Sequence, residues 1–434
     1  MTLRIVLGMV SCWISLAVSQ EMVQRERTFS EPIFFETHIL FSTNDSNTVY
    51  ALYRLRQDIF TFTKPFESVT GQFSANGRVT IEILDSTGES ITRDIRELPL
   101  TSEDNSATFL RTKYVQGRMA FKLKTGTYTV LLSIEDKDAK RQLPEVKRKL
   151  NVHKTVNNIL STVVPVQLPT RENTFECFNL NGDVQFSKDC GFLVAVKSIP
   201  AQQIRYTLKK INPEEEEKKE TVVKDTVVTA MLFPASTFTF SEKNNGVSSE
   251  ISQSDSSTVI FIPVKISRLK QGRYEINAVL SDSTKLSTTF GTRWLDMPLT
   301  LTDLDIATLP LQFIMTQDEY SQIRKGNREE RIQRFESFWQ KKDPTPETAY
   351  NEMMTEFYRR ADFAMTAYRT LKEPNGTITD RGKIFILYGK PTSTERILHP
   401  GGIPKEIWKY ASLNKTFIFE DSSKQGNYKL TESK

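Results

Sequence analysis

The sequence predicts a multi-domain protein in which two tandem antiparallel β-sandwiches of the Ig-like type precede a C-terminal α+β domain. Short runs of alternating apolar and polar residues, separated by turn residues, extend over residues 32–300. Such runs are typical of antiparallel strands that bury one face. After Thr300 the apolar residues recur at helical spacing, and from Lys383 the period returns to two. A chain of 434 residues is also long enough for about three domains.

Residues 1–19 have the pattern of a secretory signal peptide. Arg4 supplies a positive start, residues 5–18 are uncharged, and Ala17 and Ser19 form an A-x-S cleavage site. We therefore expect export from a bacterial cell to the periplasm or the outer envelope, with a mature chain beginning at Gln20. Two alternatives are lipidation of Cys12, which lies in a poor lipobox, and retention of the segment as an anchor. A membrane span needs about 20 apolar residues, so we expect no transmembrane segment in the mature chain.

Composition and motifs argue against several classes of function. Without Arg4 the chain has 57 basic and 53 acidic residues, a balance that predicts no nucleic-acid partner. The histidines His38, His153 and His399 are scattered, so we expect no metal site. The sequence has no G-x-S-x-G, no P-loop and no GxGxxG after a strand, and we expect no cofactor. A site built from paired carboxylates stays open, because spacing alone does not reveal it.

A short repeat supports two sandwiches, at residues 25–152 and 155–300. Residues 123–128 and 269–274 both read Leu-Lys-x-Gly-x-Tyr, and each is followed by an alternating strand and an aspartate, Asp136 or Asp282. In each copy we expect the glycine to form the turn into the strand. The tyrosine should bury its ring and keep its hydroxyl outside.

Cys177 and Cys190 are expected to form a disulfide in the second sandwich. Export would expose both thiols to an oxidising compartment. Between them stands Asn181-Gly182-Asp183, a strong signal for a hairpin turn. Strands folding back at this turn would bring the two sulfurs together across the ladder. A redox pair is the alternative, although it usually has C-x-x-C spacing.

The remaining residues, 301–434, form the predicted α+β domain. Helical spacing relates Ile306 to Phe313, then Ile332 to Trp339, then Met353 to Tyr368. Alternation then predicts strands at 383–388, 406–410 and 416–420. We therefore expect helices followed by a small sheet.

This C-terminal third resembles the GWxTD-domain family over about residues 294–430. The motif stands as Gly376-Thr377-Ile378-Thr379-Asp380, followed by Arg381-Gly382. Other matching segments are 338–339, 343–346, 351–352, 357–360, 406–408, 417–421 and 426–430. Thr377 replaces the name-giving Trp, and Gly389-Lys390-Pro391-Thr392 replaces Gly-Pro-Pro-Asp. The family is known mainly by its sequence pattern and typically follows exported β-rich regions. The resemblance therefore implies an envelope protein without implying an activity.

The candidate binding residues all lie in this third, and most are expected to be structural. They are Asn351, Glu352, Arg359, Arg360, Gly376, Thr379, Asp380, Arg381 and Trp408. Glu352 is expected to form a clamp with Arg359 or Arg360 on one helix face. Asp380 and Arg381 are expected to fix a turn where a strand starts. The alternative is that these residues line a binding or catalytic pocket.

The function expected from these features is that of a non-catalytic interaction or scaffold protein that binds an envelope protein or glycan. We expect no catalytic residue. One alternative is a hydrolase of envelope polymers that uses carboxylates such as Glu352 or Asp380. Another is a surface adhesin with ligand-binding loops on the sandwiches.

Overall fold

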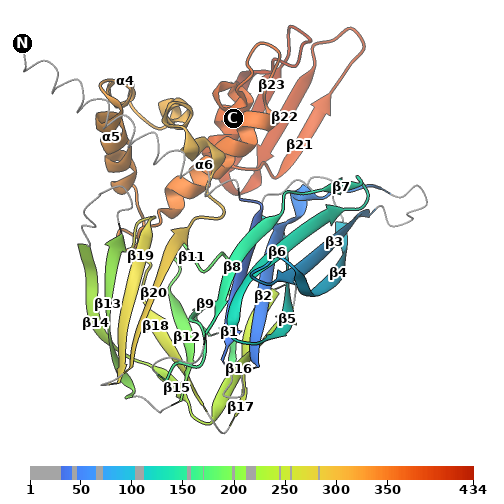
Figure 1. Cartoon of the computed structure of the whole chain (residues 1–434). Coiled ribbons are helices and arrows are strands. Elements are labelled where there is room, and N and C mark those ends of the chain that lie inside the picture. The colour runs from blue at the N-terminus through green and yellow to red at the C-terminus, as the bar shows by residue number, and fades with distance from the viewer. Residues whose placement is uncertain are drawn as a thin grey trace, which may run out of the picture. The chain divides into compact units, whose positions relative to one another are not determined.

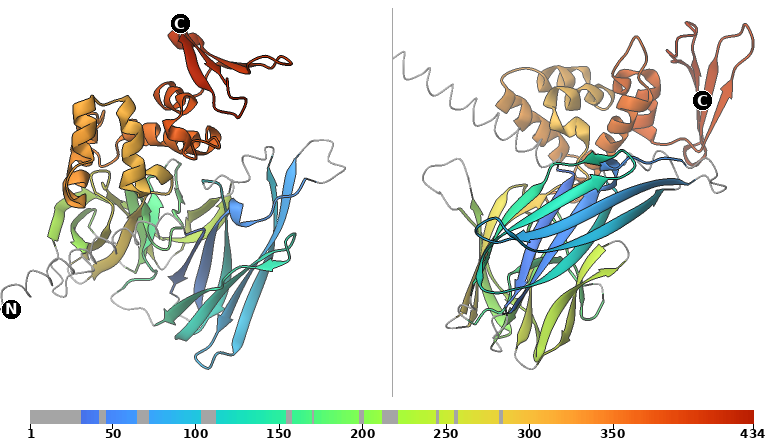
Figure 2. Two further views of the ribbon diagram at one scale, coloured as in Figure 1. Left: turned by 90° about the horizontal axis from the view of Figure 1, so that it is seen from above. Right: turned by 45° about the vertical axis from the view of Figure 1, so that its right-hand side comes forward.

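A computed structural model describes residues 31–41, 46–64, 72–102, 112–153, 158–169, 171–197, 201–211, 221–243, 246–254, 257–281 and 284–434. The predicted signal peptide, Cys12 and Asp282 lie outside these ranges. The chain divides into a β-rich unit that ends at Asp296 and a C-terminal unit that begins at Met297. The strands of the β-rich unit run from blue to yellow in Figure 1, and Figure 2 shows them from two further sides.

The first sandwich consists of two antiparallel sheets. One has the order β1 (Ile33–Leu40), β2 (Asn47–Arg56), β5 (Tyr114–Leu123). The other has the order β4 (Ser90–Ser102), β3 (Phe73–Leu84), β6 (Gly126–Asp136), β7 (Arg141–Gln142), and β8 (Val146–Val152) also pairs with β6. A short 3₁₀ helix, η1 (Gln57–Ile59), follows β2. In β3 the alternation is that of a strand with one buried face, because Val79, Ile81 and Ile83 are fully buried.

The second sandwich has three layers. Its central sheet has the order β15 (Met231–Phe233), β18 (Thr258–Val264), β12 (Cys190–Val196), β9 (Val164–Gln167). A five-stranded sheet has the order β11 (Val184–Gln185), β20 (Thr284–Arg293), β19 (Arg273–Ser281), β13 (Gln203–Ile211), β14 (Thr221–Thr229). A third sheet, which we call the hairpin sheet, has the order β10 (Thr174–Glu176), β17 (Gly246–Gln253), β16 (Ser236–Lys243).

The central sheet is buried on both faces. Val194 of β12 belongs to the core shared with the five-stranded sheet. Its neighbour Leu193 belongs to a different core, which is shared with the hairpin sheet. Every residue of β12 is therefore buried, as expected for a strand with a layer on each side. The prediction of two sandwiches is confirmed, and the hairpin sheet adds a layer to the second one.

The two sandwiches also share apolar side chains. Phe34 of β1 belongs to the core between the central and five-stranded sheets. Tyr50 and Leu52 of β2 belong to the core under the hairpin sheet. The sheet that contains β1 and β2 thus contributes side chains to the second sandwich as well as to its own core. This sharing explains why the β-rich unit forms one compact body.

The predicted disulfide between Cys177 and Cys190 is wrong. Both are free and buried. Cys177 pairs with Val166 and Cys190 pairs with Gln167, so the two cysteines stand opposite successive residues of β9. Successive residues of a strand point to opposite faces, so the two thiols lie in different cores. Burial raises the pKa of Cys177 to about 12 and the pKa of Cys190 as well.

The Asn-Gly turn exists, but it does not join a hairpin. Asn181 and Gly182 both have positive φ, at 61° and 79°, as the turn prediction requires. The strands on either side pair elsewhere, because β10 pairs with β17 and β11 runs parallel to β20. The turn therefore links two sheets instead of closing a ladder between the cysteines.

The C-terminal unit begins with short helices and ends in a four-stranded sheet. The helical elements are η2 (Leu299–Thr302), α3 (Leu304–Thr308), η3 (Leu309–Phe313), α4 (Gln317–Ile323), α5 (Arg328–Gln340), α6 (Glu352–Ala367), η4 (Gly376–Ile378) and α7 (Asp380–Tyr388). The sheet has the order β21 (Ser393–Ile397), β22 (Lys405–Tyr410), β23 (Lys415–Glu420), β24 (Lys429–Ser433), with η5 (Ala411–Leu413) between β22 and β23. Among the described helices, none is long and apolar enough to cross a membrane.

Residues 383–388 differ from the prediction, because they form most of helix α7 and not a strand. Short apolar runs do not distinguish a buried helix from a buried strand. Ile384 packs in the core under the four-stranded sheet, and Ile386 packs in the core around α6. Gly389, with φ of 76°, ends the helix.

Candidate functional site

The motif glycines let η4 and α7 pack closely against their surroundings. A Cβ on Gly376 would lie 2.0 Å from the carbonyl oxygen of Ala364 in α6. A Cβ on Gly382 would lie 1.9 Å from the carbonyl oxygen of Gly376. Either substitution would push the backbone apart, so the two positions require glycine for close approach.

Thr379 begins helix α7 as its N-cap. Its Oγ1 accepts a hydrogen bond from the Gly382 N–H at 3.1 Å and donates to the Gly376 carbonyl at 2.9 Å. The threonine is buried, and both bonds are made inside the domain. The motif threonine thus holds the η4–α7 turn together.

Thr377, which stands in place of the family Trp, is fully buried. Its Oγ1 donates to Asn375 Oδ1 at 2.7 Å, and its N–H donates to the same oxygen at 3.0 Å. The hydroxyl is therefore satisfied within its own turn. At this position the side chain offers no surface for stacking a ligand.

Asp380 contributes to the start of α7 and reaches the sheet. Its Oδ2 accepts a hydrogen bond from the Leu430 N–H of β24 at 2.8 Å, and Lys429 Nζ lies 3.7 Å from Oδ1. An acidic side chain in the first turn is also favourable for the helix dipole. Asp380 therefore fixes the start of a helix, where the sequence predicted the start of a strand.

Arg381, Glu406 and Trp408 form a compact network, the Arg381 cluster, together with Tyr368 and Tyr428. Glu406 and Trp408 lie two residues apart on β22, so their side chains share the face that packs against α7. Arg381 Nη1 lies 3.1 Å from Glu406 Oε2, and Trp408 Nε1 donates to Glu406 Oε1 at 2.8 Å. The guanidinium carbon lies 4.4 Å from the ring centre of Tyr428 and 5.5 Å from that of Tyr368.

The Arg381 cluster is largely removed from water. The side chains of Arg381 and Glu406 are 11% and 5% exposed. Burial, together with the nearby charge of Glu406, raises the pKa of Tyr368 to about 12. Removing one partner of such a pair leaves a buried charge, which is strongly destabilising. The cluster therefore ties α7 to the sheet.

The expected clamp on α6 is formed by a different acid. Arg360 Nε lies 2.7 Å from Glu356 Oε1, one turn before it on the helix, and Glu352 Oε2 instead accepts a hydrogen bond from Thr345 Oγ1 at 2.6 Å. Arg359 is exposed on the same helix. Asn351 caps α6 through the Met354 N–H and donates from Nδ2 to the Trp339 carbonyl at 2.8 Å.

The structure thus brings together part of the predicted set. The residues around η4 and α7 lie together: Gly376, Thr379, Asp380, Arg381 and, on strand β22, Trp408. Asn351 and Glu352 lie at the other, N-terminal end of α6. Glu406 was missed as a site residue, although it stands two residues from Trp408. The spacing of two on a strand places both side chains on one face, and this signal was available in the sequence.

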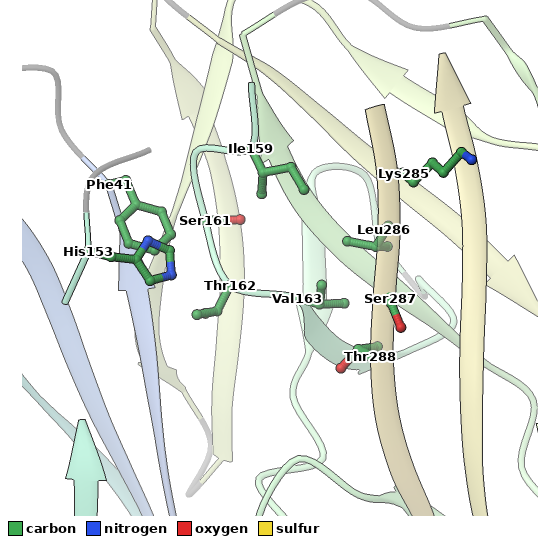
Figure 3. A pocket seen from close by; sticks show the side chains of 10 residues that line it. All are labelled: Phe41, His153, Ile159, Ser161, Thr162, Val163, Lys285, Leu286, Ser287 and Thr288. Carbon is green, nitrogen blue, oxygen red and sulfur yellow. The ribbon is translucent and has the colours of Figure 1, made fainter. Parts of the chain in front are cut away.

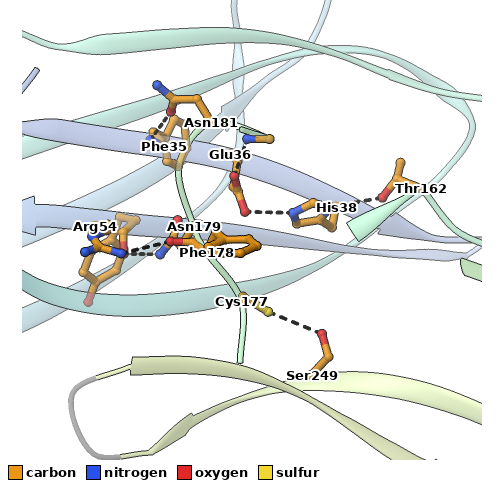
Figure 4. Close-up of polar contacts among 12 residues, drawn as sticks. Phe35, Glu36, His38, Arg54, Thr162, Cys177, Phe178, Asn179, Asn181 and Ser249 are labelled. Atoms are coloured by element: carbon orange, nitrogen blue, oxygen red, sulfur yellow. Dashed lines mark hydrogen bonds and ion pairs between the residues drawn. The ribbon is translucent and has the colours of Figure 1, made fainter. Parts of the chain in front are cut away.

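A second polar network, the junction cluster, joins the two sandwiches (Figure 4). His38 Nε2 lies 3.0 Å from Glu36 Oε1, and His38 Nδ1 lies 3.3 Å from Thr162 Oγ1. The Gly182 N–H donates to Glu36 Oε2 at 2.6 Å. Glu36 and His38 are both buried. The sequence offered no signal for this cluster, because Thr162 and Gly182 are far from β1 along the chain.

A shallow pocket lies close to the junction cluster (Figure 3). It is lined by Phe41, His153, Ile159, Ser161, Thr162, Val163, Lys285, Leu286, Ser287 and Thr288. This lining contains no carboxylate, so it does not provide the paired acids of a glycosidase. Across the described ranges, no group of three or more His, Cys, Asp or Glu side chains is placed to hold a metal ion.

Three comparisons place these features among known proteins. No curated protein sequence matches the chain. Solved structures with some likeness include a red sea bream transglutaminase at 7% identity, where 60% of this chain covers 31% of that one with a TM-score of 0.17. Others are the C-terminal domain of the Streptococcus pyogenes antigen I/II-family protein AspA (10% identity, 61% and 100% covered, TM-score 0.16) and the Yersinia pseudotuberculosis adhesin InvE (11%, 93% and 97%, TM-score 0.16).

These structural likenesses are too weak to support an argument about function. The match to a family is specific: residues 281–434 match the pattern of the GWxTD domain. This range contains β20, the whole C-terminal unit and every candidate binding residue. The C-terminal third of this protein is a GWxTD domain.

Proposed function

We propose that this chain is an exported, non-catalytic interaction protein of the bacterial envelope, whose GWxTD domain binds a protein or glycan partner. The observation that carries the proposal is that the polar motif residues are engaged within the domain. Thr379 caps α7, Asp380 receives the Leu430 N–H, and Arg381 binds Glu406. A ready structural role for each favours a binding scaffold over a reaction centre.

The arrangement of acids gives less support to the alternative, a hydrolase of envelope polymers. Such an enzyme needs one carboxyl group that protonates a leaving group and a second that acts as nucleophile or base. Glu406 has both oxygens occupied, by Arg381 and Trp408. Asp380 has one oxygen on a backbone N–H and the other near Lys429. Both acids therefore have the environment of stabilising acceptors.

Exposed apolar side chains on the GWxTD domain support a partner-binding role. Met353 and Phe363 are exposed on α6, and Leu371 is exposed in the segment that leads to η4. Phe363 stacks on Phe385 of α7, with 4.6 Å between ring centres, so this contact with α7 holds the Phe363 ring in place. Exposed apolar residues held by a rigid scaffold are typical of interaction surfaces.

The test is capture of partners from an envelope extract by the immobilised chain that begins at Gln20. We expect Phe363→Asp combined with Leu371→Asp to abolish the capture that the unmodified chain shows. Leu413→Asp in η5 is the matched control, because Leu413 is also an exposed apolar residue of this domain and should be neutral. Capture unaffected by the double change would contradict the assignment of this surface.

Catalysis is tested on envelope polysaccharides and peptidoglycan as substrates. We expect no turnover by the unmodified chain. Turnover that Asp380→Asn or Glu406→Gln removes, while circular dichroism shows an intact fold, would overturn the non-catalytic proposal.

Export is tested separately, by N-terminal sequencing of the protein recovered from the envelope. The uncharged stretch and the A-x-S site predict that the sequence begins at Gln20. A chain that begins with lipidated Cys12 would replace this proposal with membrane anchoring.

A further inference from the structure

The connection between β21 and β22, both labelled in Figure 1, exposes apolar side chains on a tight turn. We call this connection, residues 398–404, the β21–β22 tip. Leu398 and Ile403 are 68% and 44% exposed, and the four residues between them read His-Pro-Gly-Gly. The ladder between the two strands ends at the pairing of Ile397 with Lys405. Both exposed apolar side chains therefore lie beyond the end of the ladder.

Hydrogen bonds hold the turn of the tip. The Gly402 N–H donates to the His399 carbonyl at 3.0 Å, and Lys424 Nζ donates to the Gly401 carbonyl at 3.3 Å. Gly401 has φ of 78°, a conformation that favours glycine. Because the turn is already ordered, less conformational entropy is lost when the tip binds.

Cations stand directly behind these apolar residues. Arg396 precedes the tip and Lys405 follows it, and residues 396–405 contain no Asp or Glu. The side chains of Arg396 and Lys405 are 68% and 44% exposed. Lys424 joins them from the turn after β23, because its Nζ reaches the Gly401 carbonyl. The hairpin thus has an apolar end followed by a basic layer.

The acids around this layer neutralise only part of its charge. Lys405 Nζ lies 2.7 Å from Glu420 Oε1. Arg396 Nε lies 3.7 Å from Glu406 Oε2, and Arg381 Nη1 lies 3.1 Å from the same oxygen. One carboxylate therefore faces two guanidinium groups. Even when buried Asp421 is set against Lys424, four cations face three acids, so positive charge is in excess.

This order of apolar and basic residues matches the layers of a membrane surface. Leu398 lies two residues beyond Arg396, and Ile403 lies two residues before Lys405. Two residues of extended chain span about 7 Å. Apolar groups that bind at a membrane interface are buried about 5–10 Å deep, so cations at this spacing would lie among the headgroups. Anionic headgroups attract such cations.

We propose that the β21–β22 tip inserts into the surface of an anionic phospholipid membrane. Leu398 and Ile403 enter the boundary between headgroups and acyl chains, and Arg396 and Lys424 bind lipid phosphates. A specific protein interface covers about 800 Å² on each partner, whereas a membrane surface can be held by a few apolar side chains and cations. This surface goes beyond the proposed partner-binding function and consists of different residues from Phe363 and Leu371.

Vesicle flotation with the chain from Gln20 tests the proposal. Vesicles of equal parts phosphatidylglycerol and phosphatidylcholine should carry the chain upward. Binding to vesicles of phosphatidylcholine alone should be at least about tenfold weaker, because the cations lose their anionic partners. High salt should weaken binding to the mixed vesicles for the same reason.

The η5 end of β22 provides a matched control for the apolar residues. Leu413 is 48% exposed, and Lys409 and Lys415 stand on either side of it in the chain. This end therefore has similar charge but a single exposed apolar side chain. Leu398→Asp combined with Ile403→Asp should weaken binding to the mixed vesicles at least about tenfold. Leu413→Asp should leave it unchanged, and circular dichroism should show that all variants are folded.

Tryptophan fluorescence locates the inserted residue. On addition of mixed vesicles, Leu398→Trp should show a blue shift that the unmodified chain lacks, since the indole enters an apolar layer. Leu413→Trp should show no such shift. Three results would each overturn the proposal: no flotation with the mixed vesicles, equal binding by the unmodified chain and the double variant at the tip, or a blue shift for Leu413→Trp alone.

Discussion

The two sandwiches contain the same tyrosine turn, at the start of β6 in the first and at the start of β19 in the second. In the first, the Tyr128 hydroxyl donates to the Lys124 carbonyl at 3.0 Å. In the second, the Tyr274 hydroxyl donates to the Lys270 carbonyl at 2.8 Å. Each tyrosine thus closes the turn that precedes its own strand, four residues upstream. The repeated Leu-Lys-x-Gly-x-Tyr segment therefore encodes the same local structure twice.

The surroundings of this tyrosine turn differ between the two sandwiches. Tyr128 is half-buried beside a two-sheet core, whereas Tyr274 is buried. In the second sandwich the hairpin sheet covers the outer face of the central sheet, and β12 becomes buried along its whole length. The comparison teaches that a short repeat fixes a turn and a strand, but not the number of layers around them.

The largest effect is expected from a charge placed in β12. Leu193→Lys would bury an ammonium group in the core beneath the hairpin sheet, where Leu193 is fully buried. We expect a loss of more than about 4 kcal/mol in the free energy of unfolding, measured by urea denaturation. Ile95→Lys on the one-sided strand β4, where Ile95 is half-exposed, should cost less than about 0.5 kcal/mol. Similar losses for both would contradict the three-layer arrangement.

The junction between the sandwiches should show the next largest effect. Glu36→Ala removes the acceptor of the Gly182 N–H and the partner of His38, and leaves both polar groups buried. We expect a loss of about 2–4 kcal/mol in unfolding free energy. Glu82→Ala on β3 is the control, because Glu82 makes an exposed bond to Ser90. If Glu36→Ala were as mild as this control, the cluster would not connect the sandwiches.

A smaller effect should separate the two tyrosines. Tyr274→Phe loses a hydrogen bond at a buried site and should cost about 1 kcal/mol, whereas Tyr128→Phe should cost less because water replaces the bond. Thermal unfolding of both variants checks the order. The reverse order would show that burial does not distinguish the two copies.

The pH dependence of the Tyr274 contribution follows from burial, which raises the pKa of its hydroxyl above the ordinary value. Because the folded state holds the proton more tightly, this contribution is complete below the unfolded pKa of about 10. It is lost as the pH rises through the folded pKa. Tyr274→Phe should therefore reduce the loss of stability above about pH 10, measured by denaturation along a pH series.

The smallest effect is expected from a reductant. Cys177 and Cys190 lie on opposite faces of the central sheet and are free. Dithiothreitol should leave the unfolding midpoint unchanged, and a thiol reagent should label both cysteines only after denaturation. A lower midpoint under reduction would indicate a bridge and contradict the placement of the two thiols.

Part of the candidate site was predictable from the sequence. The motif glycines and Thr379 are local features, since Thr379 bonds within three residues of itself. Their structural role follows from turn and cap chemistry alone. Glu406 was also within reach, because it lies two residues before Trp408 on a strand and therefore on the same face. The contact between Glu406 and Arg381 was not, because it joins two elements that meet only in the folded domain.

The sequence by itself determined the period of the strands in the β-rich unit, the two tyrosine turns, the Asn181-Gly182 turn and the GWxTD motif, because each depends on neighbours along the chain. Only the tertiary structure decided which strands pair, on which face of the central sheet each cysteine lies, and that residues 383–388 form a helix. The strand on either side of a turn is free to choose a distant partner. A short apolar run is buried equally well as helix or strand, until the surrounding layers supply a groove for one of them.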